Sequence, residues 1–211
     1  MTGSRQGDGP TAGRALGLFG GRFDPVHRAH IAIAQAVADN LGLDEVRWIV
    51  TGAPAHKPAI ASAEDRLQMT RLALHELGDP RMVADDREII AAKNGGSNYT
   101  ADTVLSLQQD YPGRKLIWIL GEDQLQNFLS WSRWTWLVLQ VDLAVCARPN
   151  AQGSQTAKTL VEAGGKIYWV HFKPDAVSST QIRSAIQAGV LKPGVIPASV
   201  ADFIETVGLY R

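Results

Sequence analysis

The chain has a single cysteine, Cys146, among its 211 residues. One cysteine cannot form an internal disulfide, so a small disulfide-stabilised secreted fold is excluded. The sequence also has no apolar run long enough for a membrane span or for the core of a secretory signal. We therefore expect a cytoplasmic protein with no membrane partner.

An excess of charge of one sign is also absent. Lys and Arg together number 21, as do Asp and Glu together, so the formal net charge is zero. Proteins that bind nucleic acid or a membrane surface through their overall field usually carry a basic excess. We expect neither partner, and any binding of phosphate must depend on local groups.

Three common catalytic motifs are missing. The chain has no Gly-x-x-x-x-Gly-Lys-Ser/Thr loop, no dinucleotide fingerprint around Gly20-Gly21 and no Gly-x-Ser-x-Gly elbow. A P-loop enzyme, a dehydrogenase and a serine hydrolase of the usual kind are therefore disfavoured. Attack on phosphorus by a substrate that itself carries a phosphate stays open, because it needs alignment and charge stabilisation but no protein nucleophile.

Strand-like and helix-like segments alternate from residue 15 to the end. The first fourteen residues are rich in Gly, Ser, Thr and Arg, and we expect a disordered leader there. Residues 15–211 are expected to form one domain. Predicted strands cover residues 15–19, 45–50, 81–84, 115–120, 142–147 and 166–170, and predicted helices cover residues 31–38, 62–77, 100–107, 128–137, 156–163, 179–188 and 198–207.

This alternation predicts an α/β fold, a Rossmann-like doubly wound parallel sheet with helices on both faces. Ligands of such sheets bind outside the carboxyl ends of the strands. We expect a polar loop through residues 93–96, and Thr100 as the cap of the helix that follows it.

The joint between the first strand and the first helix contains glycines and two histidines. Gly20 and Gly21 allow close approach of a phosphate, and a helix start offers unpaired N–H groups. His27 and His30 are three residues apart and would share one helix face. A zinc pair is disfavoured because no third ligand is nearby, which leaves phosphate contact or ordinary core histidines.

Residues 178–183 repeat this pattern at a second helix start. Ser179 and Thr180 bring hydroxyl groups, and Arg183 follows one turn later as a planar donor suited to phosphate. A simple helix cap with a solvated arginine is the alternative. Two anion sites in one sheet, however, fit the tail of a nucleoside triphosphate.

These two segments carry a family resemblance. Residues 20–30 resemble the Gly-Gly-x-Phe-Asp-Pro-x-His-x-Gly-His signature of the nucleotidyltransferase superfamily, with Ala29 in place of the last glycine, and residues 178–183 resemble its Ser-Ser-Thr-x-Ile-Arg motif. Within the superfamily, residues 54–58, 98–100, 121–123, 131, 148–149 and 208–211 are similar to bacterial nicotinate-nucleotide adenylyltransferases.

The resemblance implies transfer of AMP from ATP to nicotinate mononucleotide, giving deamido-NAD and pyrophosphate in NAD biosynthesis. The transfer would occur by in-line attack without a covalent intermediate, and Mg²⁺ would enter mainly on the ATP phosphates.

The resemblance also assigns residues to roles. Catalytic roles fall to His27, His30 and Arg183. ATP binding falls to Gly20, Gly21, Phe23, His27, His30, Gly121, Asp123, Ser179, Thr180 and Arg183. Mononucleotide binding falls to Asp24, Lys57, Tyr99, Thr100, Trp131 and Arg148, and no metal site built from protein ligands is implied.

Alternatives remain for the function and for three residues. Nicotinamide mononucleotide or phosphopantetheine can be the acceptor of the adenylyl group, or the chain can be a non-catalytic nucleotide-binding regulator. Trp131 and Tyr99 can be packing residues, and Asp123 can be only a helix cap. A homo-oligomer is left open.

Overall fold

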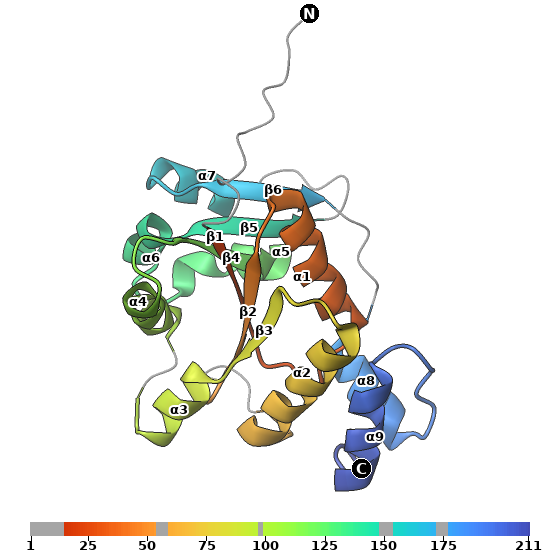
Figure 1. Cartoon of the computed structure of the whole chain (residues 1–211). Helices are drawn as coiled ribbons and strands as arrows, with labels where there is room; N and C mark the ends of the chain where they lie inside the picture. Colours follow the sequence, from red (N-terminus) through yellow and green to blue (C-terminus); the bar gives the residue numbers. More distant parts are fainter. Residues whose placement is uncertain (1–14, 54–58, 97–98, 148–153, 172–176) are drawn as a thin grey trace, which may run out of the picture.

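A computed structural model describes residues 15–53, 59–96, 99–147, 154–171 and 177–211. Their six strands form one parallel sheet in the order β3-β2-β1-β4-β5-β6 (Figure 1). The strands are β1 (Ala15–Gly21), β2 (Glu45–Val50), β3 (Met82–Asp85), β4 (Lys115–Gly121), β5 (Asp142–Ala147) and β6 (Ile167–His171). This confirms the predicted doubly wound sheet.

Helices follow every strand. They are α1 (Arg28–Leu41), α2 (Ala63–Leu77), α3 (Arg87–Lys93), α4 (Thr100–Asp110), α5 (Glu122–Gln126), α6 (Trp134–Gln140), α7 (Gln155–Glu162), α8 (Ser179–Gln187) and α9 (Ala198–Val207), with a 3₁₀ turn η1 (Phe128–Ser130) before α6. Among the described residues, none of these helices is both long and apolar enough to cross a membrane.

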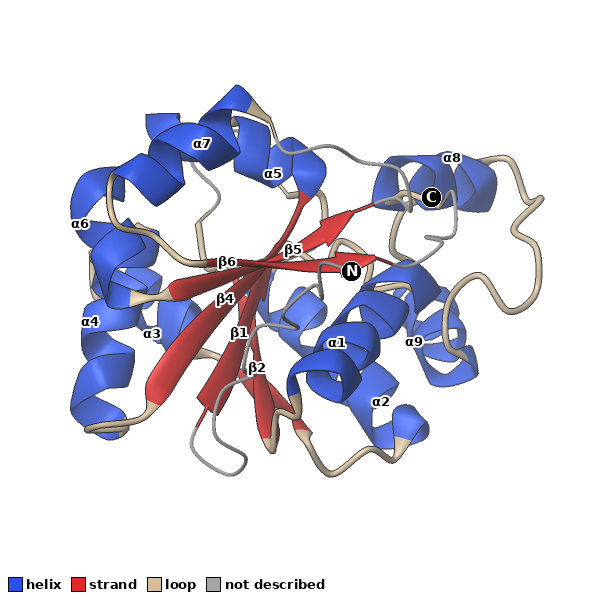
Figure 2. Ribbon diagram, turned by 90° about the horizontal axis from the view of Figure 1, so that it is seen from above, coloured by secondary structure: helices blue, strands red, loops and turns tan. Residues whose placement is uncertain are grey.

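Two separate apolar cores lie on the two faces of the sheet, because successive strand residues point to opposite sides. Along β1, Leu16 and Leu18 are packed in one core and Phe19 in the other. Helices α1, α2, α8 and α9 cover the Phe19 face, whereas α4, α5, α6 and α7 cover the opposite face (Figure 2). The helices therefore enclose both faces, as the sequence predicts.

The order of the strands reverses between β1 and β4. From β1 the chain adds β2 and β3 on one side, then crosses to β4 and adds β5 and β6 on the other. Ligands of open α/β sheets bind at such a switch point, outside the carboxyl ends of the strands. The segments after Gly21 and after Gly121 flank this point.

Helix ends follow the local chemistry of the sequence. The Ser62 hydroxyl accepts a hydrogen bond from the Asp65 amide at the start of α2, and Gly78 ends that helix with a φ of 67°. Gly42 ends α1 in the same left-handed conformation, with a φ of 61°. Glycine adopts this conformation without the steric cost of a Cβ atom.

Between residues 85 and 100, one sequence prediction is wrong and one helix is not predicted. Helix α3 lies just before the expected polar loop and was not predicted, because Glu88 and Ile89 are its only buried residues and no apolar stripe marks it. Thr100 is the first residue of α4 and not its cap. Tyr99 takes the cap position with an extended backbone, and its carbonyl oxygen accepts hydrogen bonds from the amides of Asp102 and Thr103.

Substitution of two glycines at strand ends tests how tightly the switch point is packed. A Cβ atom at Gly20 would lie 2.7 Å from Cζ2 of the buried Trp118 ring, whereas a Cβ atom at Gly121 would have no neighbour within 4 Å. We expect Gly20→Ala to lower the free energy of unfolding by about 1–3 kcal/mol, and by more than Gly121→Ala does. Urea unfolding of both variants measures this, and equal effects would contradict the packing argument.

Candidate active site

The turn between β1 and α1 is held tightly by aromatic packing. Phe23 is 2% exposed and has a φ of 48°, and a Cβ atom at Gly21 would lie 2.9 Å from its ring. Gly20 faces the Trp118 ring in the same way. The two glycines of the motif are therefore required by the fold itself, because they leave room for these rings, whatever ligand approaches the backbone.

His27 and His30 lie face to face at the start of α1. Their ring centroids are 3.7 Å apart and the ring planes differ by 22°. His27 is the N-cap residue of α1, and its backbone N–H donates to Nδ1 of His30 at 3.3 Å. A neutral ring that accepts at Nδ1 carries its hydrogen at Nε2, so His30 has its donor on the side away from the cap.

Burial keeps both histidines neutral. It lowers the pKa of His27 from 6.5 to about 4, and it lowers the pKa of His30 well below the usual value, with a further contribution from His27. Nδ1 of His27 is buried without a hydrogen-bond partner among the described residues. Each neutral ring carries one N–H donor, and an anion bound against the pair would raise both pKa values.

The Asp24 carboxylate is bound by donors of its own chain, and its contact with a mononucleotide stays a prediction. Its side chain is 2% exposed, and its carboxylate oxygens accept hydrogen bonds from the amides of Ile60 (2.9 Å) and Ala61 (3.2 Å) and from the Tyr210 hydroxyl (2.7 Å). A carboxylate occupied by three donors of its own chain has little capacity left for a ligand. We therefore assign Asp24 to holding the turn in place.

Helix α8 brings the second predicted anion site to the first. The Ser178 hydroxyl caps α8 by accepting from the Gln181 amide, and the Ser179 hydroxyl donates to the Pro25 carbonyl at 3.1 Å. Arg183 donates to the Asp24 carbonyl oxygen at 2.7 Å and to the Thr180 hydroxyl at 3.3 Å. The amino-terminal turns of α8 thus contact residues 24–25, in the turn that leads into α1.

The carboxyl end of β4 lies at the other side of the switch point. Gly121 is the N-cap of α5 with an extended backbone, and the space where its Cβ would stand is open. Asp123 is the second residue of α5 and its side chain is exposed. Asp123 is therefore not the cap of this helix, so the alternative that Asp123 is only a helix cap is wrong.

The predicted mononucleotide residues are spread over several elements. Tyr99, at the cap of α4, is 50% exposed, and Thr100 is half-buried. One face of the half-buried Trp131 ring stacks on Phe128 with centroids 4.7 Å apart. The Trp131 ring also lies edge-to-face with Trp118, with centroids 6.3 Å apart, so Trp131 has a packing role. Lys57 and Arg148 lie outside the described residues.

Sequence reasoning missed a buried arginine beneath the site. Arg66 of α2 is 1% exposed and donates to the carbonyl oxygens of Arg22 (2.9 Å) and Gly52 (3.2 Å), which follow β1 and β2. The available signal was its position, because residues 66, 69, 70 and 73 form one buried stripe of the helix. A charged residue on an apolar stripe indicates a buried partner.

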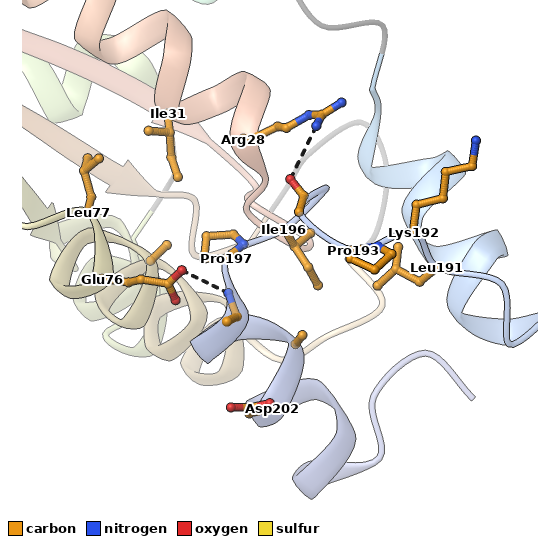
Figure 3. A pocket seen from close by; sticks show the side chains of 14 residues that line it. Arg28, Ile31, Glu76, Leu77, Leu191, Lys192, Pro193, Ile196, Pro197 and Asp202 are labelled. Carbon is orange, nitrogen blue, oxygen red and sulfur yellow. Dashed lines mark hydrogen bonds between the residues drawn. The ribbon is translucent and has the colours of Figure 1, made fainter.

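A cavity of about 710 Å³ lies close to the first turn of α1 but apart from the predicted site (Figure 3). Arg28, Ile31, Leu77, Ile196 and other residues from α1, α2, α9 and the segment before α9 line it. None of the predicted site residues is among them. The cavity is therefore separate from the residues predicted to bind substrate.

Metal ligands are not clustered in the described part of the chain. There, no group of three or more His, Cys, Asp or Glu side chains has an arrangement that would hold a metal ion.

Comparisons with known proteins identify a matching family and relatives that share one description. Residues 18–185 match the cytidylyltransferase-like family. A probable nicotinate-nucleotide adenylyltransferase of Bordetella avium is 40% identical over 202 residues, which cover 94% of this chain and 98% of the relative. The same description applies to a protein of Neisseria meningitidis serogroup B that is 38% identical over 205 residues, covering 94% and 99% of the two chains.

A solved structure shares the fold. Nicotinic acid mononucleotide adenylyltransferase of Plasmodium falciparum, complexed with NaAD, has a TM-score of 0.73 to this chain, with 93% of this chain and 97% of the other covered. The two sequences are 16% identical, so this likeness shows the fold alone.

The depressed pKa of His27 predicts how stability changes with pH. The unfolded chain binds a proton near pH 6.5 and the folded chain only near pH 4, so the free energy of unfolding should fall as pH falls through this window. We expect His27→Gln to weaken this fall in urea unfolding at pH 7 and pH 5. His75→Gln, which changes an exposed histidine, should keep the wild-type fall. Identical pH dependence in all three proteins would contradict the burial of a neutral His27.

Proposed function

Since this chain belongs to the cytidylyltransferase-like family, and within it to the nicotinate-nucleotide adenylyltransferases, we propose that it transfers AMP from ATP to nicotinate mononucleotide. The products are deamido-NAD and pyrophosphate. The observation that carries this function is the meeting of two helix starts, one with a stacked histidine pair and one with Arg183, at the switch point of the sheet.

The reaction needs no covalent intermediate. A phosphate oxygen of the mononucleotide attacks the α-phosphorus of ATP in line with the bond to the bridging oxygen, and this bond breaks as pyrophosphate leaves. Negative charge grows on the oxygens around phosphorus, where fixed donors stabilise it. His27 and His30 are such donors, because burial and stacking fix their rings before the substrate arrives.

The ATP phosphates lie between the starts of α1 and α8 in this proposal. Arg183 donates to the Asp24 carbonyl oxygen and to the Thr180 hydroxyl, and its remaining N–H groups are proposed to bind the phosphates. Ser179, Thr180 and the backbone of residues 20–23 complete this side. On the β4 side, Gly121 allows close approach and the exposed Asp123 carboxylate accepts from the ribose hydroxyl groups.

The mononucleotide lies on the side of α4 in this proposal. Tyr99 and Trp131 frame the pyridine ring, and the amino-terminal end of α4, including Thr100, meets its carboxylate. The first turn of α4 also contains an acidic residue, Asp102. It forms an ion pair with Arg133, which reduces its repulsion of a bound anion. Lys57 and Arg148 are proposed to bind the phosphate.

Mg²⁺ is proposed to enter on the ATP phosphates, where it neutralises charge on the reacting phosphate chain. We further propose that residues 15–211 act as one catalytic domain in the cytoplasm. Cys146 is compatible with a reducing compartment, because it is a free thiol and burial raises its pKa to about 12.

A substrate panel tests the proposed function. With ATP and Mg²⁺, we expect pyrophosphate release to be fastest with nicotinate mononucleotide, with kcat/KM at least about tenfold above that for nicotinamide mononucleotide, because a helix start favours the carboxylate over the neutral amide. Preference for phosphopantetheine, or ATP binding without turnover of any acceptor, would contradict the proposal.

Removal of one histidine tests the catalytic assignment. His30→Ala should lower kcat by about a hundredfold, as loss of one fixed donor to a developing oxyanion does in other enzymes. His75→Ala removes an exposed histidine at the end of α2 and should leave kcat unchanged. Circular dichroism checks that both variants fold. A folded His30→Ala variant with the wild-type rate would contradict the role of His30.

A further inference from the structure

Glu88 is a buried carboxyl group between two parts of the proposed site. It lies on α3 and is 7% exposed. The Thr103 hydroxyl donates to its Oε1 atom at 2.8 Å, and the side chain of Thr51 also forms a hydrogen bond with it. Neither hydroxyl belongs to α3, so Glu88 connects the end of β2 with the first turns of α4.

Each of the two threonines is hydrogen-bonded to a segment that is assigned to one substrate. The backbone N–H of Thr51 donates to the Gly21 carbonyl oxygen at 3.0 Å, which places Thr51 beside the turn assigned to the ATP phosphates. The Thr103 hydroxyl lies 3.4 Å from the Tyr99 carbonyl oxygen, and the Thr103 amide also donates to this carbonyl. Tyr99 is assigned to the pyridine ring. Glu88 therefore stands between the ATP side and the mononucleotide side.

The backbone beneath Glu88 has no freedom to shift toward β2. A Cβ atom at Gly52 would lie 2.3 Å from the Glu88 carbonyl oxygen and 2.9 Å from the Ala92 side chain. Such distances show that α3 is packed directly against the backbone after β2. The backbone of Glu88 consequently lies directly against the segment that contains Thr51.

An acidic residue is costly at this place. The pKa of Glu88 is raised to about 7: burial is the main cause and Asp85 adds to it, whereas the hydrogen bonds from Thr103 and Thr51, together with Arg87, oppose the rise. An apolar side chain of similar size would fill the space without that cost. The two hydrogen bonds are what a carboxyl group adds here.

We propose that Glu88 is a positioning residue for the mononucleotide, which holds the start of α4 at a fixed place relative to the ATP turn. It acts through Thr103 on the backbone of Tyr99 and does not touch substrate. This inference rests on the proposed function, because it takes Tyr99 as part of the mononucleotide site.

The connection predicts a selective effect. The link between Thr51 and Gly21 uses backbone atoms, so the ATP turn keeps it when the Glu88 side chain is removed. The start of α4 instead loses its hydrogen-bonded anchor. Binding of the mononucleotide should therefore weaken more than binding of ATP.

Four variants test this inference, with KM for nicotinate mononucleotide, KM for ATP and kcat measured on the full chain. We expect Glu88→Ala to raise KM for the mononucleotide about tenfold or more and to leave KM for ATP within about twofold. Glu88→Gln keeps an acceptor and the side-chain size, so it should restore KM to within about threefold of wild type. Thr103→Val should resemble Glu88→Ala, and Thr103→Ser should resemble wild type.

Three results would contradict the positioning role of Glu88. Equal rises in the two KM values, an unchanged KM for the mononucleotide in Thr103→Val, or no rescue by Glu88→Gln would overturn the positioning role. If Glu88→Ala does not fold, the comparison of Thr103→Val with Thr103→Ser tests the positioning role by itself. A wild-type chain that does not turn over nicotinate mononucleotide would overturn both the proposed function and the inference. If the wild type is active but the variants change KM for ATP and KM for the mononucleotide equally, only the inference is overturned.

Discussion

The buried carboxylate of Asp24 is the interaction on which the geometry of the site depends. A carboxylate removed from water is strongly destabilising unless donors surround it. Its three donors come from distant parts of the chain, the amides of Ile60 and Ala61 before α2 and the Tyr210 hydroxyl at the carboxyl terminus. The sheet, α2 and the end of the chain must all be in place before Asp24 is satisfied, so the turn after β1 takes one shape only when the whole fold has formed.

This turn then positions the groups assigned to chemistry. Its backbone carbonyl groups accept from Ser179 and Arg183 of α8 on one side and from Arg66 of α2 on the other. The same turn leads into α1, where His27 and His30 stack. Because burial keeps these two rings neutral, they are donors without charge in the empty site. If a polyphosphate binds beside these rings, as proposed, its negative charge would raise both pKa values.

The sequence predicts the sheet, its helices and the two anion-binding helix starts, because these follow from periodicity, glycine positions and capping residues. It does not predict α3, which lacks an apolar stripe, and it misassigns the Thr100 cap because Tyr99 acts through its backbone. The partners of Asp24 and Arg66 lie far away in the sequence, so no local pattern identifies them. The ligand-binding and catalytic roles assigned to the site residues, Lys57 and Arg148 among them, stay predictions.

The central claim is that a triphosphate lies between the starts of α1 and α8. A crystal structure of this chain with a non-hydrolysable ATP analogue tests it most directly. The account predicts phosphate oxygens within hydrogen-bond distance of the His27 and His30 rings and of Arg183, with Asp24 still bonded to Tyr210. Phosphates bound elsewhere, for example in the cavity beside Arg28 and Ile196, would contradict it.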